Sequence, residues 1–215
     1  GILLWNETYI CEACGRQIKT VGEPYCLKCG KELEREEAEY CRDCLCRMHS
    51  FDRGRILFVY EGPVKKSIYR FKYAARKEYA QAYAYFSERE LGDFIRDIKP
   101  DALVPVPLHR VRLRKRGYNQ AEVFAKALGR RMRIPVEGKL AMRIKNTLPQ
   151  KELDVTARQN NLKKAFKLRR NDVKLKTIII IDDIYTTGST IDALADRFRR
   201  AGVQKIYFIA ISGGR

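Results

Sequence analysis

The chain has 215 residues, of which 45% are hydrophobic and 33% charged, and its formal net charge is +18. This composition is typical of a soluble, globular protein of one or two domains. No apolar run approaches the roughly 20 residues of a membrane span and no secretory signal is visible, so we expect a cytoplasmic protein without a membrane span.

The positive charge lies outside the first 50 residues. Residues 1–50 have a net charge of −2, and the remaining residues have a net charge of +20. A body this basic favours polyanionic partners, which include nucleic acid, anionic membranes and phosphorylated small molecules. Charge alone does not choose among them.

All seven cysteines lie within residues 11–46, and six of them form three CxxC pairs: Cys11/Cys14, Cys26/Cys29 and Cys41/Cys44. Eleven residues separate successive pairs, and two pairs continue into glycine, as the tight turn of a zinc knuckle requires. Disulfides are disfavoured because no secretion signal is visible, and three pairs favour metal over a redox CxxC. We therefore predict a cysteine-rich zinc-ribbon domain over residues 1–50 that holds structural Zn²⁺.

Six thiolates do not make two closed four-ligand sites, so the ligand set has alternatives. The first choice is Cys26, Cys29, Cys41 and Cys44. The equal spacing leaves Cys11, Cys14, Cys26 and Cys29 as a rival set. Cys46 and His49 could each substitute, although the role of a bystander fits both better.

Residues 51–215 are predicted to form a second domain in which strands and helices alternate. Strands are expected over 55–60, 102–106, 177–181 and 206–211 and at Val136. Helices are expected over 63–90 with a break near 75–77, and over 91–98, 119–132, 156–165 and 191–201. Right-handed crossovers between such elements give an α/β fold with a doubly wound, mainly parallel sheet.

The most informative segment is TIIIIDDIYTTGSTIDA, residues 177–193. Its first five residues are typical of a strand buried on both faces. Asp182 and Asp183 follow at the carboxyl end of that strand, where open α/β sheets bind their ligands. The paired acids can accept hydrogen bonds from sugar hydroxyls or face a bound Mg²⁺.

The turn after the acids has the chemistry of a phosphate site. Backbone N–H groups around Gly188 and in the first turn of the next helix lack partners, and the helix dipole adds positive charge. Hydroxyl groups come from Thr186, Thr187, Ser189 and Thr190. No Gly-Lys-Ser/Thr follows, which excludes a Walker loop. A binding site for a 5-phosphorylated ribose explains the acids and the turn together better than an ordinary capped helix after a strand does.

These residues resemble the phosphoribosyl-diphosphate (PRPP) loop of type I phosphoribosyltransferases, and among those enzymes they are most similar to the ComF family, late-competence proteins of bacterial DNA uptake. Further segments carry the same resemblance: Phe71–Tyr73, Val104–Leu108, the RGYNQA segment Arg116–Ala121, and Gln150, Arg158, Asn161 and Phe166. Family members often carry another CxxC upstream, so a truncation before Gly1 would explain the unpaired Cys11 and Cys14.

The resemblance implies a Mg²⁺-dependent enzyme that binds PRPP, with Asp182, Asp183 and Arg116 as its catalytic residues. Asp182 and Asp183 would hold the ribose hydroxyls, with Asp182 the indirect Mg²⁺ partner, and the turn Thr186–Thr190 (Thr186, Thr187, Gly188, Ser189 and Thr190) would hold the 5-phosphate. The turn at Val106 and Pro107 would bind the diphosphate through backbone amides, for which a cis Val-Pro bond would serve. Arg112, Arg114, Lys115 and Arg116 would lie on a mobile loop that closes over the diphosphate.

Each of these roles has an alternative. The basic run could be a solvated loop or a contact to a DNA backbone. Lys72 could reach a phosphate, although a lysine on a helix is more often solvated. Arg158 and Asn161 could face the site or tie their helix to the preceding loop.

The second functional hypothesis is a non-catalytic adaptor. It would use the basic body and the zinc ribbon to handle single-stranded DNA together with DNA-uptake proteins. Tyr69, Tyr73 and Tyr85, which lie off the apolar stripe of their helix, could stack on bases. A metal-redox enzyme is a third and more distant hypothesis, because it depends only on an unpaired CxxC.

Overall fold

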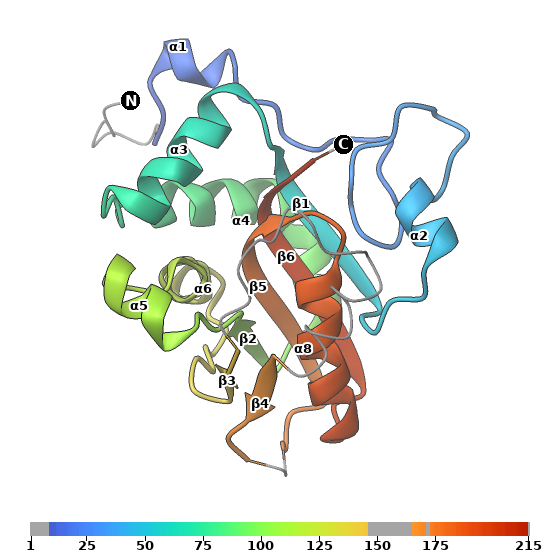
Figure 1. The fold of residues 1–215 in the computed structure, drawn as a ribbon. Helices are drawn as coiled ribbons and strands as arrows, with labels where there is room; N and C mark the ends of the chain where they lie inside the picture. The colour runs from blue at the N-terminus through green and yellow to red at the C-terminus, as the bar shows by residue number, and fades with distance from the viewer. Residues whose placement is uncertain (1–8, 146–164, 171–172, 215) are drawn as a thin grey trace.

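The structure is a computed structural model that describes residues 9–145, 165–170 and 173–214. Within these ranges, a parallel sheet contains β1 (Arg53–Val59), β2 (Ala102–Pro105), β5 (Thr177–Tyr185) and β6 (Lys205–Gly213) in the order β1-β6-β5-β2. Two short strands, β3 (Ala141–Arg143) and β4 (Phe166–Leu168), form a separate antiparallel pair. The predicted α/β fold with a mainly parallel sheet is confirmed (Figure 1).

Helices cover both faces of the parallel sheet (Figure 1). One face packs against α3 (Gly62–Tyr73), α4 (Tyr79–Ile98) and α6 (Gln120–Met132), and the other packs against α8 (Ser189–Arg200). Along β5, Ile179 and Ile181 point to the first layer, while Ile178 and Ile180 point to the second. Because both faces are buried, this strand needs no polar alternation, which explains its uninterrupted isoleucine run.

Predicted element boundaries differ most from the structure in α4 and β5. Residues 91–98 are not a separate helix, because α4 continues through them with Leu91 and Ile95 buried on the same stripe. β5 extends past the predicted end at Ile181 to Tyr185, because β6 continues beside it as far as Gly213. Asp182 and Asp183 therefore lie inside the strand rather than after it.

Other boundaries agree with the sequence. The break near 75–77 is confirmed, since α3 ends at Tyr73 and Ala75 has a φ of 52°. The strand expected at Val136 is reduced to an isolated parallel bridge with Leu103. Gln150, Arg158, Asn161 and the predicted helix over 156–165, except Ala165, lie outside the described residues.

The cysteine-rich segment packs directly on the edge of the sheet at β1. Val21 N–H donates to Leu57 O over 2.9 Å, and Gly54 N–H donates to Lys28 O over 2.9 Å. Gly30 has a φ of +71°, and a Cβ there would lie 2.7 Å from Gly54 O. The close approach of the knuckle to β1 therefore requires glycine at position 30.

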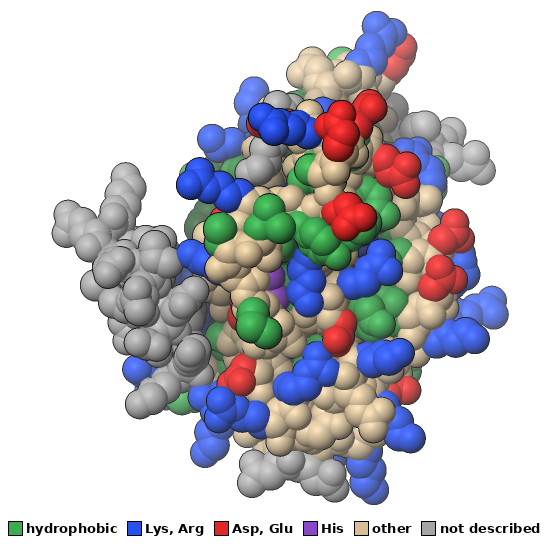
Figure 2. Space-filling view, turned by 90° about the vertical axis from the view of Figure 1, so that its right-hand side faces the viewer, with side chains coloured by type: hydrophobic (Ala, Val, Ile, Leu, Met, Phe, Trp, Pro, Cys, Tyr) green, Lys and Arg blue, Asp and Glu red, His purple; other side chains and the backbone are tan. Residues whose placement is uncertain are grey.

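Charge and apolar surface are unevenly distributed on the side of the molecule that carries α2 (Arg42–Cys46). Figure 2 shows hydrophobic side chains in the middle of this face, between acidic side chains above and lysine and arginine side chains below. Among the described residues, no helix has both the length and the hydropathy that crossing a membrane requires.

Candidate functional site at the carboxyl ends of the strands

The ends of two strands and two helices meet at one edge of the sheet. Val106, directly after β2, donates its N–H to Ile181 O of β5 over 2.9 Å. Asn119, the N-cap of α6, donates its side-chain N–H to Val106 O over 3.0 Å. The first residue of α6, Gln120, donates to Asp183 of β5 over 2.7 Å. These contacts bring the predicted acid pair, the Val106–Pro107 turn and the RGYNQA segment together.

Asp183 is the centre of a buried network. Its Oδ2 atom accepts from Gln120 Nε2 and lies 2.9 Å from Lys72 Nζ. Gln120 Oε1 in turn accepts from Arg116 Nη1 over 2.6 Å. Burial acts to raise the pKa of Asp183, but the charge of Lys72 and the hydrogen bonds to the carboxylate hold that pKa below its usual range. Asp183 is therefore an anion across the neutral pH range.

Asp182 has the opposite electrostatic environment. Its Oδ1 atom accepts the backbone N–H of Asp183 over 2.8 Å, and the residue is 9% exposed. Burial, followed by the charge of Asp183, raises the pKa of Asp182 to about 8. The two environments therefore favour protonation of Asp182 over protonation of Asp183.

This raised pKa predicts a pH-dependent stability. Protonated Asp182 stabilises the fold below the unfolded-state pKa of about 3.9, and this contribution is lost as the pH rises towards 8. At pH 8.5 the free energy of unfolding of Asp182→Asn, measured with urea, should therefore exceed that of the native chain by about 3 kcal/mol. Near pH 4 the two free energies should be equal. The control is Asp93→Asn, because that side chain is 96% exposed. If the free energies of unfolding of the native chain and of Asp182→Asn depend on pH in the same way between pH 4 and 8.5, the raised pKa of Asp182 is contradicted.

The predicted phosphate turn, Thr186–Thr190, lies at the start of α8, which begins at Ser189 with Gly188 as its N-cap at a φ of 76°. No side chain among the described residues caps this helix, so its first N–H groups face outward. The hydroxyls of Thr187 and Ser189 lie 2.9 Å apart at the same end. An uncapped helix end that carries hydroxyl groups has the chemistry of a phosphate site.

The turn after β2 differs from the prediction in its peptide geometry. Among the described residues, the cis peptide bond is Glu23–Pro24, so the expected cis Val-Pro bond was wrong. The extended trans backbone is kept because Val106 continues the ladder with β5.

The basic run after the turn is also not the predicted loop. Arg112, Arg114, Lys115 and Arg116 lie on α5 (Arg110–Arg116), which begins at the N-cap His109 and ends at Gly117 with a φ of 80°. The run forms a helix because arginine, lysine and leucine all favour it and both ends are capped. Arg116 reaches the acids through Gln120, and its guanidinium lies 5.0 Å from the centre of the Tyr73 ring.

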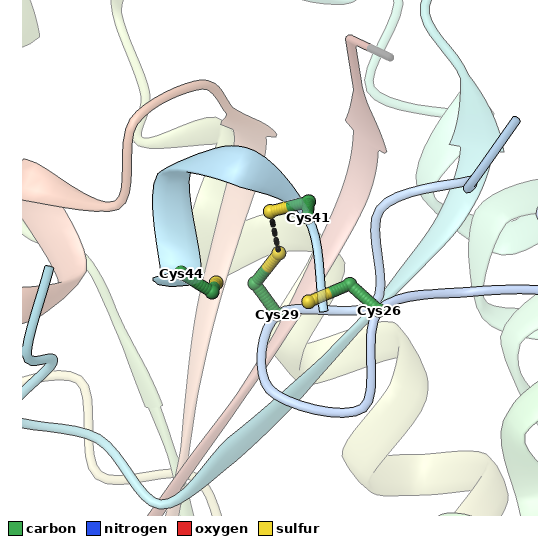
Figure 3. Close-up of side chains that lie close together, drawn as sticks. All are labelled: Cys26, Cys29, Cys41 and Cys44. Atoms are coloured by element: carbon green, nitrogen blue, oxygen red, sulfur yellow. Dashed lines mark hydrogen bonds between the residues drawn. The ribbon is translucent and has the colours of Figure 1, made fainter. Parts of the chain in front are cut away.

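Four cysteine sulfurs form a compact cluster (Figure 3). Cys26, Cys29, Cys41 and Cys44 place their Sγ atoms within 4.8 Å of one another, and the Cys29 and Cys41 sulfurs are 3.7 Å apart. A tetrahedral zinc with Zn–S bonds of about 2.3 Å requires S···S distances of about 3.8 Å. The cluster is consistent with structural zinc.

The other cysteines lie apart from this cluster. Cys11 and Cys14 are at α1 (Glu12–Gly15), where they line a cavity next to α3 and α4. Cys46 is exposed. His49 Nε2 lies 3.5 Å from Cys44 Sγ, so His49 is beside the cluster and outside it.

Comparisons with known proteins agree with this two-part organisation. A family model described as "Double zinc ribbon domain" matches residues 5–45, and one described as "Phosphoribosyl transferase domain" matches residues 116–214. "Competence protein F" of Haemophilus influenzae is 35% identical over 210 residues, which cover 92% of this chain and 87% of that protein. "DNA utilization protein YhgH" of Escherichia coli is 29% identical over 200 residues, with the same two coverages. "Competence protein ComFC" of Bacillus subtilis is 28% identical over 200 residues, covering 88% and 77%. The chain therefore belongs to the ComF family, in which a double zinc ribbon precedes a phosphoribosyltransferase domain.

Proposed function

We propose that this chain binds PRPP with Mg²⁺ and transfers its phosphoribosyl group to an acceptor, in a protein that acts in DNA uptake. One observation carries the proposal: a buried acid pair near the carboxyl end of β5 is followed, across one turn, by an uncapped helix start. A 5-phosphorylated ribose has vicinal hydroxyls for the acids and a phosphate for the helix. The names of the relatives, which refer to competence and DNA utilization, support the cellular role.

The acids would act on the ribose hydroxyls. Asp183 is a fixed anion that accepts from Lys72 and Gln120, so its remaining lone pairs suit a sugar hydroxyl. Asp182 would release its proton to solvent, so that its carboxylate could accept from the second hydroxyl and help to hold Mg²⁺. Bound Mg²⁺ would neutralise charge on the diphosphate as it leaves. Affinity for the ligand should therefore rise from pH 6 to pH 8.

The diphosphate would lie between the Val106–Pro107 turn and α5. Backbone amides near this turn, together with Arg112, Arg114, Lys115 and Arg116, would bear its charge. In the transfer step, the bond from ribose C1 to the diphosphate oxygen breaks while the acceptor's lone pair forms a new bond to C1. The diphosphate departs with the bonding electrons, and the acceptor loses its proton to solvent.

Diphosphate release tests this proposal. The zinc-loaded chain is mixed with Mg²⁺, PRPP and nucleobase or amine acceptors, and released diphosphate is measured with a coupled assay. We expect release that depends on an acceptor and is lost in Asp183→Asn. Release that is the same with native protein and with Asp183→Asn would contradict the assigned site.

We further propose that Cys26, Cys29, Cys41 and Cys44 hold one structural Zn²⁺, and that residues 1–50 and 51–215 are the two domains. The sulfur geometry supports the first proposal, and the family match over residues 5–45 supports both. Cys26 and Cys29 pack in the same apolar cluster as Ile56 and Val59 of β1, so the proposed zinc site is continuous with the apolar core of the sheet.

A specific surface favours binding of single-stranded DNA as a second function. α5 has no buried residue and carries five arginine and lysine side chains. Next to it, Tyr69 and Tyr73 are 65% and 61% exposed, with ring centres 5.0 Å apart. Exposed rings beside cations are the elements of a sequence-tolerant single-strand site.

This second function predicts a strong salt dependence. Fluorescence anisotropy with a labelled oligonucleotide measures the affinity at several salt concentrations. The logarithm of the affinity should fall steeply with the logarithm of the salt concentration, with a slope that corresponds to the release of several counterions. Arg114→Gln should reduce that slope by about one unit. The control is Arg89→Gln, on α4. An affinity that does not depend on salt, or the absence of binding, would contradict the proposed binding of single-stranded DNA.

A further inference from the structure

One buried histidine connects the cysteine cluster to the phosphate turn. The His49 side chain is fully buried, its Nε2 atom lies 3.5 Å from Cys44 Sγ, and its Nδ1 atom donates to Asp192 Oδ2 over 2.8 Å. A histidine that contacts one cysteine of a candidate metal site and is itself held by a carboxylate can orient that cysteine toward the metal. Here the carboxylate belongs to a distant element, α8.

Asp192 fixes the first turn of that helix. Its Oδ1 atom accepts the backbone N–H of Ser50 over 2.9 Å, so both carboxylate oxygens are held by consecutive residues, 49 and 50. Its backbone N–H donates to Gly188 O over 2.8 Å, which closes the first bond of α8. The position of residues 49–50 therefore determines the position of the turn that would receive the phosphate.

The turn also packs directly on the histidine. A Cβ built on Gly188 would lie 3.2 Å from His49 Cε1 and 2.7 Å from the Tyr185 hydroxyl. Tyr185 is itself buried. Two buried side chains thus fill the space between the cluster and Gly188, so little room remains for the turn to shift independently.

The far end of α8 is held by the same segment. Arg199 Nη2, in the last turn, lies 2.8 Å from Asp52 Oδ2. His49 itself stacks on Phe51, with ring centres 4.6 Å apart. Residues 49–52 therefore hold α8 at both ends, while Cys44, five residues earlier, belongs to the cluster.

We propose that His49 is a positioning residue that couples the cysteine cluster to the phosphate turn, so that metal in the cluster strengthens binding of the 5-phosphoribosyl ligand. This inference rests on the proposed function. The coupling of two binding sites is reciprocal, so the ligand must tighten the metal by the same factor.

The reciprocal effect is the first test. Zinc affinity is measured by competition with a chelator, with and without saturating Mg²⁺–PRPP. We expect PRPP to tighten zinc by about fivefold or more in the native chain. In His49→Asn, whose amide can donate to Asp192 but does not reach Cys44, we expect PRPP to leave zinc affinity unchanged. Met48→Ala is the matched control, because Met48 is adjacent and fully exposed. Equal coupling in the native chain and His49→Asn, or no coupling in a native chain that binds PRPP, would overturn the proposal.

A second readout needs no ligand. Amide hydrogen exchange of residues 192–194 is compared in zinc-loaded native protein, His49→Asn and His49→Ala, with the start of α6 as internal reference. We expect exchange at 192–194 to be about fivefold faster or more in His49→Ala, and intermediate in His49→Asn. Identical exchange in all three proteins would overturn the proposal. If the native chain binds no PRPP, the proposed function fails, and this exchange measurement alone decides the role of His49.

Discussion

Cys29→Ser is expected to remove bound zinc and to lower the free energy of unfolding by about 3 kcal/mol or more, because structural zinc binding is part of the folding free energy. Cys29 is fully buried and packs in the same apolar core as α8 and the sheet. The variant therefore loses a ligand and leaves a hydroxyl in a site built for a thiolate. Zinc content by elemental analysis and urea unfolding by circular dichroism measure both effects.

Cys46→Ser is the matched control, since Cys46 is exposed and lies outside the cluster. It should keep about one zinc per chain and the native stability. Cys14→Ser should behave in the same way, because α1 holds Cys14 away from the other pairs. A fully folded Cys29→Ser protein without zinc would refute a structural role for the metal. Loss of zinc in Cys14→Ser would show that the ligand set is different.

Lys72→Met is expected to destabilise the chain by about 3 kcal/mol at neutral pH, because it leaves the charge of Asp183 buried without its counterion. The Lys72 and Asp183 side chains are only 16% and 8% exposed, so solvent screens their attraction weakly. The low pKa of Asp183 stabilises the native fold above the unfolded-state value of about 3.9, and this stabilisation is lost as the pH falls below it. In the variant, burial raises that pKa, so the difference between the two proteins should be largest near pH 7 and should close below about pH 4.

Two further proteins make this test specific. Lys65→Met removes an exposed lysine from the same helix and should leave stability unchanged. Lys72→Met/Asp183→Asn removes both charges, and it should recover most of the stability that Lys72→Met loses. If the double variant is no more stable than Lys72→Met, the loss came from packing of the lysine stem, and the ion pair would not be the cause.

The chemistry of the site was predictable where it is local in sequence. A branched apolar run, two acids and a turn rich in glycine and hydroxyls are contiguous, so their pattern indicated a phosphoribosyl loop without any tertiary contact. The CxxC pairs likewise indicated a zinc site, but their equal spacing left Cys11, Cys14, Cys26 and Cys29 as a rival to the first choice of Cys26, Cys29, Cys41 and Cys44. The ends of β5 and α4 were missed because they depend on the neighbouring strand and on helix packing.

Residues that act across the fold could not be assigned in the same way. The resemblance of Phe71–Tyr73 marked Lys72, but this lysine is about 110 residues from Asp183 in sequence, so its ion pair with Asp183 required the structure. His49 follows the last CxxC pair and resembled a spare ligand, whereas its partner Asp192 lies 143 positions further along the chain. Gln120 and Asn119 belong to the RGYNQA segment, so the motif marked them, but their contacts to Asp183 and Val106 required the structure.

The most direct test of the phosphoribosyl site is a calorimetric titration of Mg²⁺–PRPP into the zinc-loaded native chain and into Asp182→Asn/Asp183→Asn at pH 8. We predict that the native chain binds with a Kd between about 1 μM and 1 mM, a range typical of enzyme substrates. We predict that the double variant, folded and zinc-loaded, shows no heat of binding. A folded, zinc-loaded native chain that does not bind PRPP, or a double variant that binds it equally well, would contradict the account.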